Sequence, residues 1–97
     1  MTGKAYRFEW RPMAREDLRA IVQYIGKDSP TIARAFGKSL RDRTTPLAEH
    51  PALGRLGRLP DIRELVVYPN YIVFYRVLDE ARTVQVLRVK HAAQQVP

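Results

Sequence analysis

The pattern of apolar positions near the start of the chain predicts a strand followed by a helix. Aromatic side chains occupy every second position of residues 5–10, as in a strand with one buried face, namely Tyr6, Phe8 and Trp10. After Pro12, which suits the first turn of a helix, the apolar residues take helical spacing to about Lys27. These residues are Leu18, Ile21, Val22 and Ile25.

A second helix is predicted directly after the first. Ser29 is a suitable N-cap residue, and Pro30 suits the first helical position. Apolar residues then continue with helical spacing at Ile32, Phe36 and Leu40. Pro46 removes one backbone hydrogen bond, so we expect the helix to continue, bent, to about Ala48. The short connection predicts an antiparallel helical hairpin.

The second half of the chain predicts a loop and three strands. Residues 51–61 contain two glycines and two prolines, which is typical of a loop, and we expect its leucines to anchor it to the core. The three strands are Ile62–Tyr68, Tyr71–Leu78 and Thr83–Lys90, with a short tail at 91–97. Because the turns between them are short, the strands should form an antiparallel meander. The central strand is apolar at nearly every position, as expected of a strand covered on both faces.

The predicted order β-α-α-β-β-β indicates an α+β fold, with a helical hairpin packed on one face of a small, mainly antiparallel sheet. The other face should stay partly open. At 97 residues we expect one domain, 1–97. The absence of cysteine excludes disulfides and thiolate metal sites, and two histidines are too few for a histidine-rich metal centre. No apolar run reaches the ~20 residues of a membrane helix, so we expect a cytoplasmic protein with no membrane partner. A chain this short builds only a modest core, so we expect no cofactor.

The chain is strongly basic, with a net charge of +7. Of its 17 basic residues 13 are arginine, whose planar guanidinium suits phosphate and carboxylate groups. We therefore expect an acidic partner, unless the charge serves only solubility. Six basic residues of the loop and strands form a candidate anion-binding set: Arg55, Arg58, Arg63, Arg76, Arg88 and Lys90. The alternative is a scatter of surface charges, some of them paired with Glu64, Asp79 or Glu80.

Several stretches, taken in their order and spacing, carry a family resemblance. They are Ala14–Leu18, Ile21–Ile25, Leu47–Pro51, Gly57–Pro60, Arg63–Val67, Pro69–Val77 and Val86–Ala92. Together they resemble the RelE/ParE superfamily of toxins from type II toxin–antitoxin pairs, over nearly the whole chain. The resemblance implies the same β-α-α-β-β-β fold. It also implies a bacterial toxin held inactive by a cognate antitoxin, whose extended or helical segment wraps around it and through which alone operator DNA is bound.

The resemblance implies two alternative targets. ParE-like members inhibit DNA gyrase, whereas RelE-like members cut mRNA on the ribosome with basic residues and an acid/base group. RelE-like ribonucleases typically carry arginine where this chain has Ile72, and lysines where it has Arg63 and Leu65. Isoleucine cannot stabilise the charge of a phosphorane-like transition state. Some of them also have a catalytic tyrosine after the last strand, which residues 91–97 lack. A ParE-like gyrase inhibitor is therefore favoured.

The resemblance leaves two further hypotheses and a set of contact residues. A ribosome-dependent mRNA endonuclease would use Arg63, Arg76 and His91 as catalytic residues, because histidine is a common general acid or base. Alternatively, His91 only caps the end of a strand. A third hypothesis is an inactive toxin that acts with its antitoxin as a DNA-binding co-repressor. We expect the antitoxin to contact the helical hairpin and the open sheet face, at Leu18, Ile21, Tyr24, Phe36 and Arg76.

Overall fold

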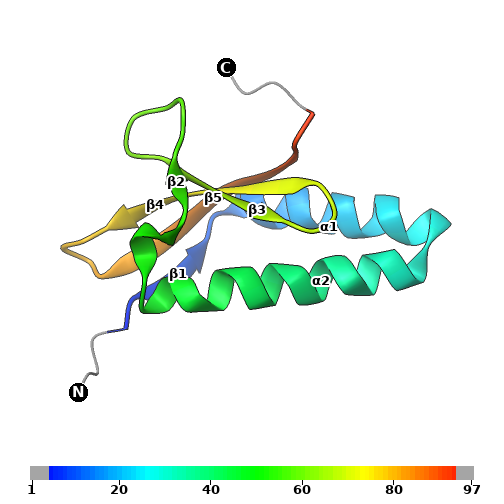
Figure 1. Cartoon of the computed structure of the whole chain (residues 1–97), viewed down its shortest axis with the longest axis horizontal. Coiled ribbons are helices and arrows are strands. Elements are labelled where there is room, and N and C mark those ends of the chain that lie inside the picture. The colour runs from blue at the N-terminus through cyan, green and yellow to red at the C-terminus, as the bar shows by residue number, and fades with distance from the viewer. Residues whose placement is uncertain (1–4, 94–97) are drawn as a thin grey trace.

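Each of the two long helices begins at a proline that follows a non-helical residue. A computed structural model, which describes residues 5–93, places α1 at Pro12–Asp28 and α2 at Pro30–Thr44. Between them, the Ser29 Oγ accepts a hydrogen bond from the Ile32 N–H at 3.1 Å, so the predicted N-cap is confirmed. The helices run back along each other, as the short connection predicts (Figure 1).

The end of α2 differs from the prediction. The helix stops at Thr44, and Thr45–Ala48 forms a 3₁₀ turn, η1, instead of a bent continuation. Pro46 lies in this turn and has no N–H, so the α-helical ladder of hydrogen bonds cannot pass through it. The prediction of a continuous helix to Ala48 is therefore wrong in its last turn.

Within the described residues, five strands form one mixed sheet. In chain order they are β1 Arg7–Trp10, β2 Arg55–Leu56, β3 Arg63–Val67, β4 Tyr71–Leu78 and β5 Thr83–His91. Across the sheet the order is β1-β5-β4-β3-β2, so β1 and β2 are the two edges. The strands β3, β4 and β5 form the predicted antiparallel meander, and β1 lies parallel to β5.

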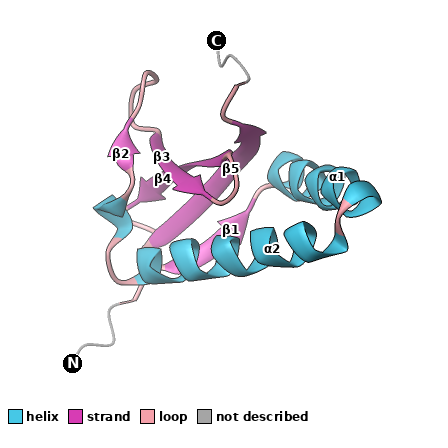
Figure 2. Cartoon of the chain, turned by 45° about the vertical axis from the view of Figure 1, so that its right-hand side comes forward, coloured by secondary structure: helices cyan, strands magenta, loops and turns pink. Residues whose placement is uncertain are grey.

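The core lies between the two helices and one face of the sheet. Figure 2 shows both helices on the same side of the sheet. The side chains buried there come from both layers: Phe36, Leu40, Leu47, Leu65, Val67, Val73, Tyr75, Val84, Val86 and Val89. On the other face Phe74 is also buried, but Arg76 is exposed, so that face is partly open, as predicted.

The N-terminal strand is shorter than predicted. It begins at Arg7, because the N–H of Tyr6 donates to the carbonyl of Ala48 rather than to the sheet. At the other end of the chain β5 reaches His91, and the tail predicted to follow it is described only to Ala93. The rest of that predicted tail, residues 94–97, lies outside the described residues.

The loop predicted at 51–61 contains a 3₁₀ turn, η2 (Pro51–Leu53), and the edge strand β2. Because β2 has only two residues, it gives no alternating pattern that sequence analysis could detect. The prediction that the leucines anchor this loop is wrong for two of them. Leu53 and Leu56 expose 53% and 67% of their surface.

The last residues of β5 are hydrogen-bonded to a side chain of α1 instead of to the strand β1. The shorter strand β1 stops at Trp10, opposite Val86, and among residues 5–93 no strand pairs with the later residues of β5 on that side. There the Asp17 carboxylate accepts the N–H of Val89 at 3.0 Å and the guanidinium of Arg88 at 2.7 and 3.0 Å. These hydrogen bonds attach α1 to the sheet edge.

Candidate functional site

An apolar groove opens between β1, α1 and α2. It has a volume of about 460 Å³. Its apolar lining comes from all three elements: Phe8, Trp10, Leu18, Val22 and Leu40. Phe8 and Val22 expose 36% and 40% of their surface, which leaves apolar area available to a partner. We call this surface the helix groove.

The rim of the helix groove is basic. Arg41 of α2 lines one side of it. Beyond α1, Arg15 and Arg19 border a second hollow of about 590 Å³, which shares three apolar residues with the groove, Trp10, Leu18 and Val22. The apolar floor therefore continues across α1 with arginines on both sides. Such a surface fits an amphipathic segment that carries acidic residues beside its apolar ones.

The five residues predicted to contact an antitoxin do not share one surface. Leu18 lies in the helix groove, whereas Ile21 and Tyr24 line a different hollow on α1. Phe36 is fully buried, so the prediction that it contacts a partner is wrong; its helical spacing is that of the core face. Arg76 is exposed on the sheet face that the helices leave uncovered.

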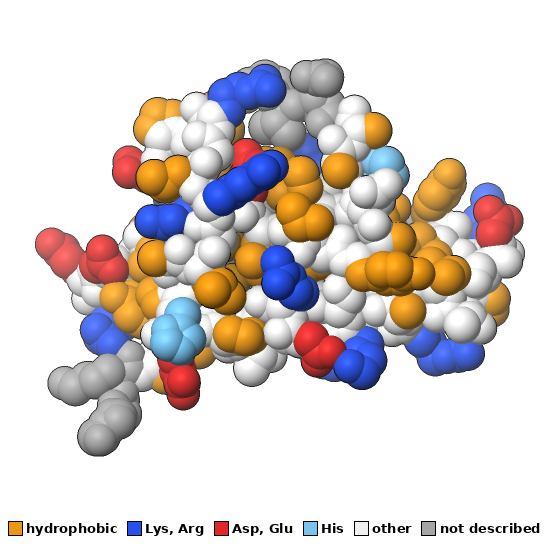
Figure 3. Space-filling view, viewed as in Figure 1, with side chains coloured by type: hydrophobic (Ala, Val, Ile, Leu, Met, Phe, Trp, Pro, Cys, Tyr) orange, Lys and Arg blue, Asp and Glu red, His pale blue; other side chains and the backbone are white. Residues whose placement is uncertain are grey.

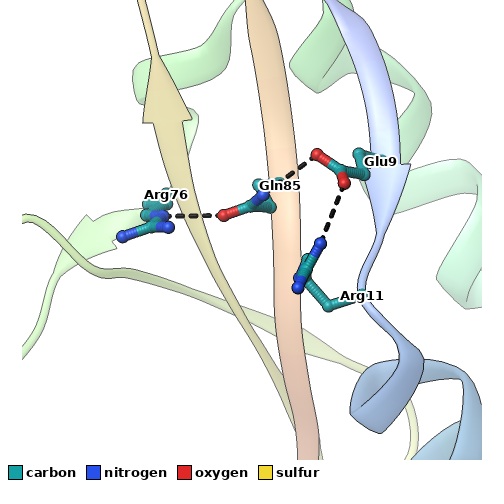
Figure 4. Close-up of polar contacts among 4 residues, drawn as sticks. All are labelled: Glu9, Arg11, Arg76 and Gln85. Carbon is teal, nitrogen blue, oxygen red and sulfur yellow. Dashed lines mark hydrogen bonds and ion pairs between the residues drawn. The ribbon is translucent and has the colours of Figure 1, made fainter.

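Four polar side chains form a ladder on that open face, across β4, β5 and β1 (Figure 4). The Arg76 Nε donates to the Gln85 Oε1 at 2.7 Å, and the Gln85 Nε2 donates to the Glu9 Oε1 at 2.9 Å. Arg11 donates to the other oxygen of Glu9 at 3.1 Å. The hydrogen bonds from Gln85 and then from Arg11 lower the pKa of Glu9, so its carboxylate stays charged and keeps both donors in place.

Arg63 holds the loop that precedes β2. Its Nη1 donates to the carbonyl of Gly54 at 2.7 Å and to that of Ala52 at 3.3 Å. Tyr75, its partner across the sheet, accepts the N–H of Gly54 at 2.8 Å and donates to the carbonyl of Pro51 at 2.7 Å. Burial raises the pKa of Tyr75, which keeps the phenol protonated and able to donate.

The three candidate catalytic residues do not meet in one site. Arg63 pairs with Tyr75, so the next residue, Arg76, points to the opposite face of the sheet. His91 pairs with Tyr71, which lies about 13 Å from Tyr75 along β4. Its ring packs edge-on against that of Tyr71, with centroids 5.2 Å apart. The predicted set is divided between two faces and two ends of the sheet.

The predicted anion-binding residues also do not form a single patch. Arg55 pairs with Glu64 at 3.1 Å, and Arg88 pairs with Asp17 at 2.7 Å. These two arginines therefore have carboxylate partners within the chain. The alternative interpretation, in which some of the basic residues are paired with nearby acids, holds for Arg55 and Glu64.

The other basic residues of that set lie apart. Lys90 is on the open face, near the opposite end of β4 from Arg76, whereas Arg58 is exposed on the loop between β2 and β3. Figure 3 shows the basic side chains spread over the visible face, with acidic and apolar ones between them. Within residues 5–93 no group of three or more side chains suits a metal ion, and no helix there is long and apolar enough to cross a membrane.

The helix groove is not apparent from the sequence pattern. The pattern predicts a buried strand face for Phe8 and Trp10 and the core face of the first helix for Val22, yet all three line the groove. A signal was present in the apolar stripe of α1, in which Ile21 and Val22 are adjacent. Adjacent positions are about 100° apart on a helix, so one of them tends to lie at the margin of the buried face.

Comparison with known proteins places the chain in a family. A family model described as the ParE toxin of the type II toxin–antitoxin system parDE matches residues 8–96. The chain belongs to this toxin family. Toxin RelE2 of Caulobacter vibrioides is 42% identical to it over 85 residues, which are 88% of this chain and 91% of that protein. The chain is thus a type II toxin of the RelE/ParE superfamily, as the resemblance predicts.

Solved structures confirm the fold of this toxin. The chromosomal ParDE system of Pseudomonas aeruginosa contains a chain that matches with a TM-score of 0.76 at 22% identity, covering 92% of this chain and 98% of that one. A chain of the Mycobacterium tuberculosis RelBE2 toxin–antitoxin complex matches with a TM-score of 0.65 at 25% identity, covering 96% and 98%. The α+β fold of two helices on one mixed sheet is shared with both.

Proposed function

We propose that this toxin acts on DNA gyrase and that a cognate antitoxin neutralises it by binding the helix groove. The separation of Arg63, Arg76 and His91 is the observation that carries the choice of target. Cleavage of mRNA needs an acid, a base and charge-stabilising groups around one phosphate. Residues on two faces and at two ends of a sheet cannot surround one phosphate, which favours a target that is inhibited by binding.

Two further observations support a non-nuclease. The Arg63 guanidinium is engaged with two loop carbonyls, so its use on a phosphate would release the loop. Ile72 lies on the open face in register with Lys90, where RelE-like ribonucleases typically carry arginine. An apolar side chain there provides no charge for a transition state.

The groove supports the second part of the proposal. The solved relatives include toxin–antitoxin complexes, and a small disordered antitoxin needs a large surface to offset its ordering. An acidic amphipathic segment would place apolar side chains on Trp10, Leu18 and Val22 and carboxylates near the arginines of the rim. The uncovered side of the edge strand β1 offers backbone hydrogen bonds to an extended part of the same segment. Operator DNA would then be bound through the antitoxin alone.

The target is tested with the purified toxin in two parallel assays. We expect a few-fold molar excess of toxin to block supercoiling of relaxed plasmid by DNA gyrase, and addition of antitoxin to restore it. Translating ribosomes with defined mRNA should yield intact mRNA at the same toxin concentration. Codon-specific cleavage with undisturbed supercoiling would contradict the proposal and establish the ribonuclease. Normal growth on expression without antitoxin would instead favour the inactive co-repressor.

A further inference from the structure

A projecting segment, residues 53–62, carries exposed apolar and basic side chains together. Leu53 and Leu56 expose more than half of their surface, and the side chain of Arg55 exposes 68%. Arg58 is exposed in the same segment. Figures 1 and 2 both show the loop that joins β2 to β3 standing out from the sheet, away from the two helices. Leu53 lies in η2 and Leu56 in β2, at the base of this loop, and Arg58 lies in the loop itself. The segment therefore presents exposed apolar area beside exposed positive charge.

The base of the projecting segment is tightly held. Arg63 and Tyr75 bind the carbonyls and the N–H of the loop around Gly54 through the four contacts given above. A Cβ at Gly54 would lie 2.7 Å from the Tyr75 hydroxyl, so only glycine permits this approach. At Gly57 a Cβ would overlap the carboxylate of Glu64. The loop before β2 is therefore packed against the sheet without room for a side chain at Gly54, whereas at Gly57 the obstacle is the end of the flexible Glu64 side chain.

A rigid base that holds exposed side chains in place is typical of a binding surface. Preorganisation lowers the conformational entropy lost on binding, and recognition residues commonly lie on loops that a rigid scaffold holds in position. We propose that the projecting segment is the surface by which the toxin contacts its target protein. Leu56 enters an apolar recess of the target, and Arg58 faces acidic groups at its rim. The inference rests on the proposed function in that it takes the target to be a protein.

The composition of the segment favours protein over RNA. Residues 51–63 contain no aromatic side chain on which an unpaired base could stack, so that only arginine could provide a stacking platform there. Leucine makes no specific contact with a base edge or a phosphate. Arginine is enriched in protein interfaces, and the exposed leucines supply apolar area that a protein partner can cover.

The position of the segment separates it from the helix groove. The groove lies at the β1 edge and the projecting segment at the β2 edge, which are four strand spacings, or about 19 Å, apart across the sheet. The two surfaces can therefore be altered independently. Substitutions in the segment should change the effect on the target and leave the affinity for the antitoxin unchanged.

The test uses two segment variants and two matched controls in the full-length toxin. Leu56→Glu and Arg58→Glu alter the segment; Met13→Glu, at a site with 55% exposure on α1, and Arg34→Glu, at an exposed site on α2, make equivalent changes elsewhere. Each variant is measured for its thermal unfolding midpoint, antitoxin affinity, growth arrest and inhibition of purified DNA gyrase. We expect the segment variants to lose growth arrest and to inhibit gyrase at least tenfold more weakly, with unchanged unfolding and antitoxin affinity, while both controls behave as wild type.

Other outcomes are equally decisive. Full growth arrest by folded segment variants would overturn the inference, whatever the target is. A third outcome combines two results: only the segment variants, and not the controls, lose growth arrest, and the wild-type toxin neither inhibits gyrase nor cleaves mRNA. This outcome would keep the inference and reject gyrase as the target. Cleavage of ribosome-bound mRNA by the wild type, lost in the segment variants, would show that the segment contacts RNA and would overturn the protein-contact inference.

Discussion

At the residue scale, Asp17 joins parts of the fold that are far apart in the sequence. Burial raises the pKa of Asp17, but hydrogen bonds from Arg88 and the Val89 N–H outweigh it, and the pKa lies below its usual 3.8. The pair therefore stabilises the fold above about pH 4, and its contribution is lost as the pH falls through the folded-state pKa. We expect Asp17→Asn to lower the free energy of unfolding by about 2 kcal/mol at neutral pH.

The same prediction has a pH signature that urea denaturation can measure. The difference between wild type and Asp17→Asn should narrow as the pH is lowered from about 5 to about 2, because the wild-type carboxylate then becomes protonated. The exposed pair of Lys38 and Asp42 provides the control, since Asp42→Asn should change stability by less than about 0.5 kcal/mol. If Asp17→Asn lowers the free energy of unfolding by the same amount at both ends of this pH range, then the charge of Asp17 is not the cause of the destabilisation.

At the scale of elements, the loop before β2 depends on one hydroxyl group. Tyr75→Phe removes the acceptor of the buried Gly54 N–H and the donor to the Pro51 carbonyl. We expect this variant to lose about 2 kcal/mol of stability, since a buried donor is left unsatisfied. Hydrogen exchange of the Gly54 amide should also become faster than that of the β4 and β5 amides, because the loop loosens before the meander does.

The control for this prediction is Tyr68→Phe, at a tyrosine that exposes 51% of its surface. Its stability should stay within about 0.5 kcal/mol of wild type. If Gly54 exchanges at its wild-type rate in Tyr75→Phe, then Arg63 alone holds the loop. The proposed rigidity of the projecting segment would then not depend on Tyr75.

The elements differ in how well the sequence predicts them. The helical starts at Pro12 and Pro30, the Ser29 cap and the limits of β4 follow from strong local signals, and they were predicted correctly. The strand β2 was missed because its two residues give no alternating pattern. The candidate site failed for a different reason. The basic residues suggested one anion-binding set. However, the strand register, which depends on the whole sheet, puts these residues on different faces and at different ends of the sheet.

At the scale of the whole molecule, the two edges of the sheet have different characters. The β1 edge carries the apolar helix groove with its arginine rim, and the β2 edge carries the projecting segment. A net charge of +7 attracts any acidic partner at long range, so charge alone does not choose between these surfaces. The specificity must therefore come from the apolar side chains. Those of the helix groove suit a partner segment that binds along the groove, and those of the projecting segment suit a recess on the surface of the target.

This division gives a prediction for the antitoxin. Val22→Glu places a carboxylate on the apolar floor of the helix groove, so it should weaken antitoxin binding at least tenfold, about 1.4 kcal/mol, by isothermal titration calorimetry. Val66→Glu is the matched control, because Val66 exposes 49% of its surface on β3, away from the groove, and should bind as wild type does. Raising the salt concentration should weaken binding of the wild type, since the arginine rim is exposed and screened. Equal affinity of the two variants would place the antitoxin elsewhere, and binding insensitive to salt would show that the arginine rim contributes little to it.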